Sequence, residues 1–300
     1  MPKFAAAGVL VLGIFASTAP ANDQDPDRLE SLNVDGVVRQ WRMYVPPSYE
    51  TDTPMPLVID LHGTGSNPHG EARLTGFEGL AAEEGFLVAS PAAKYPRDED
   101  GRLTWNVDLH SHAADDVQFI RMLISSISGR FAVDPTRIYA TGMSGGARMS
   151  SRLACNLSDS IAAIGPVAGV RYPKDCKPSR PVPVIAFHGK EDGVNTYEHN
   201  ADSPGYWRMG VEEAVRRWAE SNQCADLPTE ERIAPAVTRI SYRACSQEAA
   251  IVFYRSEDAG HTWPGSPLAD VLAEAGLGKT DRDIPATRLI WEFFERHALP

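Results

Sequence analysis

The sequence predicts an α/β fold with a mostly parallel central sheet and helices on both faces. Short apolar runs suited to buried strands alternate with segments of helical periodicity. This alternation favours parallel strands joined by crossover helices. The chain has 300 residues, of which 43% are hydrophobic, and no repeat or low-complexity linker divides it. One large domain with one continuous sheet is therefore expected.

The strand candidates are the apolar runs at 37–45, 56–61, 85–91, 138–141, 161–168, 182–187 and 251–255. Helices are expected over 76–84, 115–128, 147–153, 211–220 and 284–297. The last of these is amphipathic, because its large apolar side chains fall on one side. Residues 92–114 are polar and irregular, and loops of this length in compact domains are commonly functional.

Residues 1–21 have the pattern of a secretory signal peptide. Lys3 is the positive start, 5–15 is apolar, and 19–21 is a small-x-small cleavage site. An uncleaved anchor is the less favoured alternative, because the apolar run is shorter than the roughly 20 residues of a membrane span. No stable membrane insertion is therefore expected after cleavage. Residues 22–34 are polar and acidic and predict a flexible N-terminal segment.

The charge balance argues against nucleic acid as a partner. The formal net charge is −11 at pH 7, and removal of Lys3 with the signal makes it more negative. A surface of this sign repels phosphate backbones, and no basic cluster offsets it.

Four cysteines, Cys155, Cys176, Cys224 and Cys245, favour disulfides in an exported chain. Three pairings are possible. The sequential pairing of Cys155 with Cys176 and Cys224 with Cys245 is preferred because it closes two local loops of similar length. One pair of buried thiols is the alternative. Zinc is disfavoured because the sequence has no C-x-x-C.

The segment Gly-Met-Ser-Gly-Gly at 142–146 matches G-x-S-x-G and has a β-rich run before it and a helical segment after it. This order predicts a nucleophile elbow, a sharp turn that holds Ser144 in a strained conformation. Glycines two residues to either side are needed where strand and helix nearly touch. A purely structural turn is the alternative, since the short motif also arises by chance.

An acid and a histidine follow two later strands. The run 182–187 leads to Asp192, and 251–255 leads to His261. Catalytic groups of parallel sheets gather at the carboxyl ends of the strands. The order Ser144, Asp192, His261 is the one expected of an α/β-hydrolase.

Each predicted role follows from the chemistry of the side chain. His261 accepts the proton of Ser144 as the serine attacks, and Asp192 fixes the tautomer of the imidazole and stabilises its cation. The glycine-rich loop after 56–61 is suited to an oxyanion hole, with backbone N–H groups of Thr64 and Gly145 as donors.

Several other residues are candidates for the site. Glu191 and Asp258 are alternative acids. His62, Trp105 and Trp263 are candidate substrate contacts. The alternative for His62 is a structural hydrogen bond, and the alternative for the two tryptophans is packing in the core. A metal cluster of His110, His112, Asp115 and Asp116 is disfavoured, because the spacing is unusual and no distant ligand matches it.

Motifs spread over the chain carry a family resemblance. They are Leu-His-Gly-Thr at 61–64, Trp-Asn at 105–106, Asp-Asp-Val at 115–117, Val-Asp-Pro-Thr-Arg-Ile-Tyr at 133–139, Gly-Met-Ser-Gly-Gly at 142–146, Leu-Ala-Cys at 153–155, His-Gly-Lys-Glu-Asp at 188–192 and Gly-His-Thr-Trp-Pro-Gly at 260–265. Together they resemble secreted polyhydroxybutyrate-depolymerase-like esterases, which are close to the feruloyl and acetylxylan esterases of carbohydrate esterase family 1.

The resemblance covers residues 35–300 and implies one α/β-hydrolase catalytic domain there, with no metal or organic cofactor. The family's nucleophile, acid and base fall on Ser144, Asp192 and His261. Its oxyanion donors fall on Gly145 and on Thr64, where many members carry cysteine. A backbone donor tolerates that difference.

These observations predict an exported serine esterase, secreted or periplasmic, whose partner is a small or oligomeric ester. Hydroxyalkanoate oligomers are the first substrate class and feruloyl or acetyl esters of plant polysaccharide fragments the second. Crystalline polymer is not expected, because no separate polymer-binding domain follows the last helix. An acyltransferase on the same fold and an inactive binding protein are the remaining alternatives, and the oligomeric state is left open.

Overall fold

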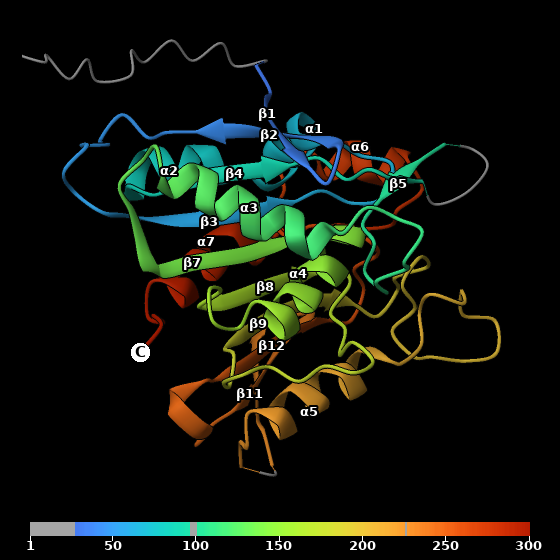
Figure 1. Cartoon of the computed structure of the whole chain (residues 1–300). Helices are drawn as coiled ribbons and strands as arrows, with labels where there is room; N and C mark the ends of the chain where they lie inside the picture. The colour runs from blue at the N-terminus through green and yellow to red at the C-terminus, as the bar shows by residue number, and fades with distance from the viewer. Residues whose placement is uncertain (1–27, 97–100, 226) are drawn as a thin grey trace, which may run out of the picture.

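The central element is one ten-stranded sheet in which the strands follow the order β1-β2-β4-β3-β7-β8-β9-β12-β11-β10 (Figure 1). The computed structural model describes residues 28–96, 101–225 and 227–300. The strands in chain order are β1 (Glu30–Val34), β2 (Val37–Tyr44), β3 (Met55–Leu61), β4 (Leu87–Pro91), β7 (Val133–Met143), β8 (Ala163–Val167), β9 (Val184–Gly189), β10 (Thr229–Ala234), β11 (Val237–Tyr242) and β12 (Ile251–Ser256). A separate short ribbon pairs β5 (Tyr95–Pro96) with β6 (Leu103–Thr104).

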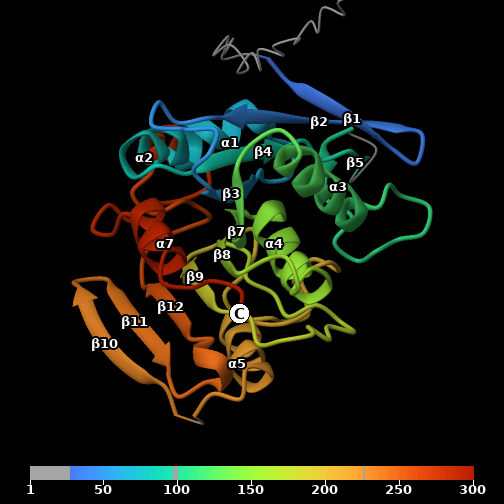
Figure 2. The ribbon, with the colours of Figure 1, turned by 60° about the vertical axis from the view of Figure 1, so that its left-hand side comes forward.

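The middle of the sheet is parallel, as expected. The neighbouring pairs from β4 through β3, β7, β8 and β9 to β12 are all parallel. Antiparallel hairpins extend both ends, β1–β2 at one and β11–β10 at the other, and Figure 2 shows them on opposite sides of the molecule. The carboxyl ends of β7, β9 and β12 therefore lie along one edge.

Helices cover both faces. They are α1 (Pro68–Thr75), α2 (Phe77–Glu84), α3 (Asp116–Ser128), α4 (Gly145–Asn156), α5 (Val211–Ser221), α6 (Ala269–Glu274) and α7 (Ala286–Phe294), with a 3₁₀ turn at Ser246–Glu248. Strand β3 has buried side chains on both of its faces. Its Leu57 and Ile59 join the core formed with α3, α4 and α5, while Val58 joins the core formed with α2 and α7. This two-sided burial explains the continuous apolar run.

The N-terminal prediction is partly wrong. Residues 30–34, which the polar composition assigned to a flexible segment, form edge strand β1 paired with β2. Exposed and half-buried positions alternate along most of β1. An edge strand of this kind has a polar sequence, and that is why its composition resembles that of a flexible segment. The signal-peptide prediction at 1–21 lies outside the described residues. Within the part of the chain that is described, no helix has the length and apolar character of a membrane span.

Both disulfides have the preferred sequential pairing. Cys155 at the end of α4 is bonded to Cys176 in the loop after β8. Cys224 just beyond α5 is bonded to Cys245 just beyond β11. Each bridge ties a helix of one layer to a loop near the sheet, and together they account for all four cysteines of the sequence.

Candidate active site

Ser144 lies at the turn between β7 and α4 in a backbone conformation that side chains rarely adopt, with φ 56° and ψ −111°. Close approach of β3 explains the glycines of the motif. A Cβ at Gly142 would come 2.2 Å from the carbonyl oxygen of Leu61, and one at Gly146 would come 1.7 Å from the same atom. Only glycine avoids these clashes, so the motif is built as a nucleophile elbow requires.

Backbone hydrogen bonds to β8 and α4 anchor the strained turn. The Ser144 N–H donates to the carbonyl of Val167 at 3.0 Å, and the Ser144 carbonyl accepts from the N–H of Arg148 at 3.1 Å. Gly169 packs so closely that a Cβ there would lie 2.6 Å from the Ser144 carbonyl oxygen. Ser144 is 9% exposed.

The structure pairs His261 with Asp192. The Nδ1 atom of His261 lies 2.7 Å from Oδ2 of Asp192, and both side chains are buried. The N–H groups of Val194 and Asn195 each donate to Oδ1 of Asp192 at 2.8 Å. The N–H of His261 donates to the carbonyl of Leu277 at 2.7 Å. Loop contacts thus fix the acid and the base from independent segments.

Electrostatics keep Asp192 ionised. Burial alone raises the pKa of this carboxyl, but hydrogen bonds from His188 and His261 outweigh it and hold the pKa well below its ordinary value. Nε2 of His188 lies 3.2 Å from Oδ2 of Asp192 and 2.8 Å from the carbonyl oxygen of Asn195, which makes it a support of the acid. An ionised Asp192 stabilises the imidazolium form of His261.

The alternative acids lie elsewhere. Glu191 is exposed, and Asp258 forms an ion pair with Lys279. Asp192 is the carboxyl that contacts His261, so the geometry favours the acid chosen from the sequence.

The two predicted oxyanion donors lie side by side. A Cβ on Gly145 would come 3.1 Å from the backbone N of Thr64 and 2.7 Å from its hydroxyl. The hydroxyl of Thr64 is in turn hydrogen-bonded to that of Thr104 at 2.7 Å. The predicted donors Thr64 and Gly145 are thus close neighbours beside the elbow, and an oxyanion hole at this place is taken up as a proposal below.

Comparison with known proteins identifies the family. Residues 39–214 match the family model described as esterase PHB depolymerase. The chain belongs to this family. Feruloyl esterase B of Piromyces equi is 34% identical over 194 residues, which cover 61% of this chain and 35% of that protein. A bifunctional acetylxylan esterase/xylanase of Neocallimastix patriciarum is 26% identical over 241 residues, covering 79% of this chain and 33% of that protein.

The chain thus spans about a third of the length of these two relatives. Among solved structures, the acetyl xylan esterase from Aspergillus awamori has a TM-score of 0.59 at 15% identity, covering 84% of this chain and all of that one. A thermostable esterase has a TM-score of 0.57 at 15% identity over 90% of this chain and 63% of its own. These neighbours agree with the α/β-hydrolase fold predicted from the sequence.

The three candidate substrate contacts of this esterase-family chain are buried within its framework. Nε2 of His62 accepts from the N–H of Ala93 at 3.0 Å, and Trp105 donates from its indole to the carbonyl of His62 at 2.8 Å. The indole of Trp263 donates to the hydroxyl of Thr287 at 2.9 Å. With exposures of 1%, 2% and 0% for His62, Trp105 and Trp263, these side chains support the oxyanion loop and the core.

Glu71 of α1 was not predicted as a site residue, and it hydrogen-bonds both the residue before the nucleophile and the loop after β3. It is fully buried, and its Oε1 accepts from the N–H of Met143, the residue before the nucleophile, at 3.2 Å. The backbone of Gly63, at the start of the oxyanion loop, also hydrogen-bonds to it. Burial, and then the charge of neighbouring Asp60, hold the pKa of Glu71 well above its ordinary value. The uncertain periodicity of its short helix gave no signal for this role.

The disfavoured metal cluster has other partners. Asp116 forms a buried ion pair with Arg39 at 2.6 Å, and Asp115 caps α3 by accepting from the N–H of Gln118. His110 and His112 stack on each other instead of converging with the aspartates on one point. Among the described residues, no cluster of histidine, cysteine and acidic side chains is arranged to hold a metal ion.

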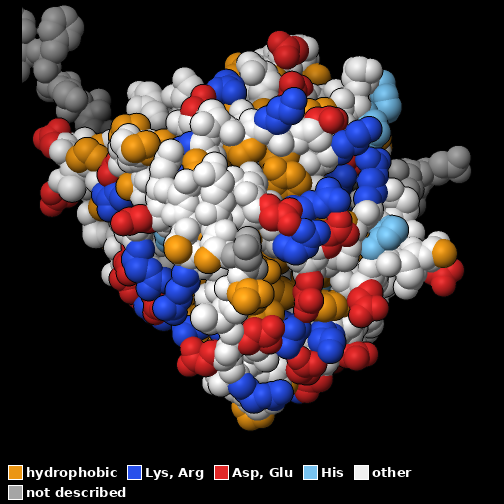
Figure 3. Space-filling view, turned by 90° about the horizontal axis from the view of Figure 1, so that it is seen from below, with side chains coloured by type: hydrophobic (Ala, Val, Ile, Leu, Met, Phe, Trp, Pro, Cys, Tyr) orange, Lys and Arg blue, Asp and Glu red, His pale blue; other side chains and the backbone are white. Residues whose placement is uncertain are grey.

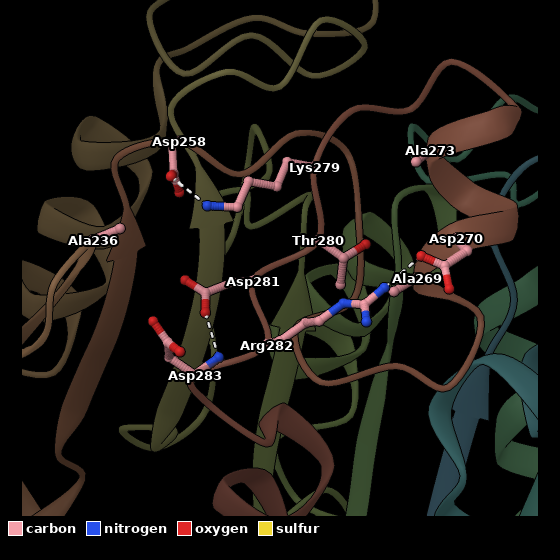
Figure 4. A pocket seen from close by; sticks show the side chains of 10 residues that line it. All are labelled: Ala236, Asp258, Ala269, Asp270, Ala273, Lys279, Thr280, Asp281, Arg282 and Asp283. Atoms are coloured by element: carbon pink, nitrogen blue, oxygen red, sulfur yellow. Dashed lines mark hydrogen bonds and ion pairs between the residues drawn. The ribbon is translucent and has the colours of Figure 1, made fainter.

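A cavity of about 480 Å³ lies next to the segment that holds the His261 loop (Figure 4). Two of its four aspartates form ion pairs, Asp258 with Lys279 and Asp270 with Arg282. The carbonyl of Lys279 accepts from the N–H of Gly260 at 2.9 Å, directly before His261. The cavity wall and the loop that carries the base are therefore joined by a backbone hydrogen bond.

Proposed function

We propose that this protein is an exported serine esterase that hydrolyses carboxylic esters through an acyl-enzyme on Ser144. The observation that carries the proposal is the coincidence of a strained, glycine-flanked serine with a separately held Asp192–His261 pair at the same sheet edge. The two disulfides agree with an oxidising compartment, the secretory route or the periplasm.

In this mechanism the Ser144 oxygen attacks the ester carbonyl while His261 takes its proton, and the C=O electrons move to the oxygen held by the Thr64 and Gly145 N–H groups. Collapse expels the alcohol, which receives the proton from His261. Water then attacks the acyl-enzyme in the same way, and the acid is released with Ser144 restored. Each oxyanion donor supplies about 3 kcal/mol of transition-state stabilisation.

We propose hydroxyalkanoate oligomers and similar short esters as the first substrate class, on the strength of the family match. Feruloyl or acetyl esters of plant polysaccharide fragments are the second candidate, supported by the similarity to a feruloyl esterase and to a bifunctional acetylxylan esterase/xylanase. Transfer of the acyl group to a sugar instead of water is a further variant of the same chemistry.

The test is a matched panel of a soluble hydroxybutyrate oligomer, methyl ferulate and acetylated xylan, with wild type and Ser144→Ala. Comparing kcat/KM across the panel measures differential binding of the transition states. A clear preference for the oligomer supports the first class, and a preference for the feruloyl or acetyl ester supports the second. Absence of hydrolysis across the panel, together with transfer to an added sugar, would replace the esterase by an acyltransferase.

A further inference from the structure

A second cavity, of about 220 Å³, has a cationic lining. It lies between the loop after β8 and the segment that leads into α5. Its lining includes Arg171, Lys174, Arg208 and Arg217, and none of its described lining residues is acidic. Trp207 forms an apolar part of the wall. We call this cavity the cationic pocket.

A chain of contacts links the cationic pocket to the oxyanion hole. Arg148 lies 3.4 Å from the hydroxyl of Thr64, whose backbone N–H is a proposed oxyanion donor. The guanidinium of Arg148 stacks over the ring of Tyr206, 4.2 Å from its centroid. Tyr206 directly precedes Trp207 and Arg208 of the pocket. On the other wall, Val170 follows Gly169, which packs on the Ser144 carbonyl.

Among the described residues, the charges of the pocket are only partly neutralised. Asp108 bonds Arg171 at 2.6 Å and lies 3.4 Å from Arg208, and Glu213 pairs with Arg217. Two carboxylates thus face four cations in a chain with a net charge of −11. On the face that Figure 3 presents, Lys and Arg side chains lie among Asp and Glu side chains.

Burial of Arg171 makes the excess of positive charge in the pocket more costly. Its side chain is almost wholly buried, and its pKa is lowered first by that burial and further by repulsion from Arg208, although Asp108 opposes the shift. An anion in the pocket would relieve the repulsion and add charge-assisted hydrogen bonds to a guanidinium that is already held in place.

We propose that the cationic pocket binds a carboxylate carried by the ester substrate, away from the ester group that Ser144 attacks. This inference rests on the proposed esterase function and gives it a substrate class, anionic esters. The carboxylate has two possible sources with the same chemistry. One is a uronic acid residue on an esterified saccharide, and the other is the free terminal acid of a hydroxyalkanoate oligomer.

Two matched substrate pairs distinguish these sources. The first is a hydroxybutyrate trimer with a free terminal acid against its methyl ester, and the second is an acetylated xylo-oligosaccharide with a glucuronic acid branch against one without it. With wild type we expect kcat/KM to favour the anionic member of at least one pair by about tenfold, the factor typical of one hydrogen bond to a charged group. Added salt should reduce the preference because partly exposed charges are screened.

The variants are Lys174→Gln with Arg208→Gln, chosen because both side chains are exposed, and Arg288→Gln as the control. Arg288 is an exposed cation of α7 paired with Glu83 and Glu84, in the opposite helix layer. The pocket variant should bring the anionic-to-neutral ratio towards one, while the control keeps the wild-type ratio.

Equal kcat/KM for both members of both pairs in wild type would contradict the proposal that the cationic pocket binds a carboxylate. A preference that survives in the pocket variant would contradict it as well. In either case, hydrolysis of the neutral members by wild type leaves the esterase function standing. Loss of all hydrolysis would instead contradict the proposed function itself.

Discussion

At the residue scale, Asp192 is the most constrained side chain of the site. Two backbone N–H groups and two histidines surround its carboxylate. Asp192→Asn keeps the shape but removes the charge and presents an N–H to one of these donors. We expect kcat on a soluble ester to fall by about 10⁴-fold because the tautomer of His261 is no longer fixed. Glu191→Gln, an exposed neighbour, is the control, and equal losses in the two variants would contradict the assignment of Asp192.

His62 predicts a dependence of stability on pH. Its Nε2 accepts from the N–H of Ala93, so the ring holds its proton on Nδ1, which faces the carbonyl of Gly63 at 2.7 Å. Burial lowers the pKa of His62 from 6.5 to about 4. Between these values the unfolded chain binds more protons, so stability is present above pH 6.5 and is lost as pH falls towards 4.

The free energy of unfolding should therefore drop by about 2 to 3 kcal/mol from this residue between pH 7.5 and pH 4.5. Urea unfolding at both pH values measures it. His62→Gln keeps an acceptor for Ala93 but does not titrate, so its drop should be smaller by that amount. The same drop in variant and wild type would show that His62 is not the group responsible.

At the element scale, the crossing of β3 under the start of α4 predicts opposite effects for two glycine substitutions. Gly146→Ala places a Cβ against the carbonyl of Leu61 and should cost about 3 kcal/mol, with loss of activity as the elbow moves. Gly79→Ala in α2 meets nothing within 4 Å and should stabilise by about 0.5 to 1 kcal/mol, because alanine is the better helix former.

Thermal unfolding and kcat of the two variants check this pair. A tolerated Gly146→Ala with full activity would mean that strand and helix do not approach as closely as the elbow requires. Gly79→Ala reports what the same chemical change does in an unhindered helix, so the difference between the variants isolates the contact with Leu61.

The elements that could be predicted from the sequence are more buried than those that could not. Strands β3, β4 and β9 are buried at every position, and such strands appear as continuous apolar runs. Strand β10 is exposed at nearly every position and has the sequence Thr-Glu-Glu-Arg-Ile-Ala, so its pairing with β11 left no hydrophobic signal. Helix α1 begins at Pro68 after the N-cap residue Asn67, and this pair is a helix start signal. The apolar periodicity of the helix is weak, so the helix was not predicted.

The site divides in the same way. Ser144, Asp192 and His261 follow strands β7, β9 and β12, which were visible in the sequence, so their position at the carboxyl ends of these strands could be predicted. The contacts of Glu71 depend on where α1 packs, and the cationic pocket depends on loops without periodicity. Tertiary packing, not local pattern, determines both.

At the scale of the whole molecule, the two disulfides predict a stability that depends on oxidation. Each closes a local loop across a sequence separation of 21. In the chain-entropy model, each contributes about 3 kcal/mol by restricting the unfolded chain. Replacing Cys224 and Cys245 by serine should lower Tm by roughly 5 °C for a chain of this size.

That bridge lies at the far end of α5, so we expect kcat below Tm to be retained. Scanning calorimetry with and without reductant measures the effect, and wild type with reductant should lose more than the serine variant because both its bridges are opened. Equal Tm values for the oxidised wild type and the serine variant would contradict the stabilising role.

Across the whole molecule, Ser144, Asp192 and His261 come from distant parts of the chain, and His261 contacts Asp192. The central proposal is that Ser144 carries the acyl group. The direct measurement is acid-quenched mass spectrometry after mixing the protein with p-nitrophenyl acetate. Wild type should gain one acetyl group on the peptide that contains Ser144, and Ser144→Ala should gain none and release no burst of nitrophenol. An acetyl group on another residue, or full turnover by Ser144→Ala, would contradict the account.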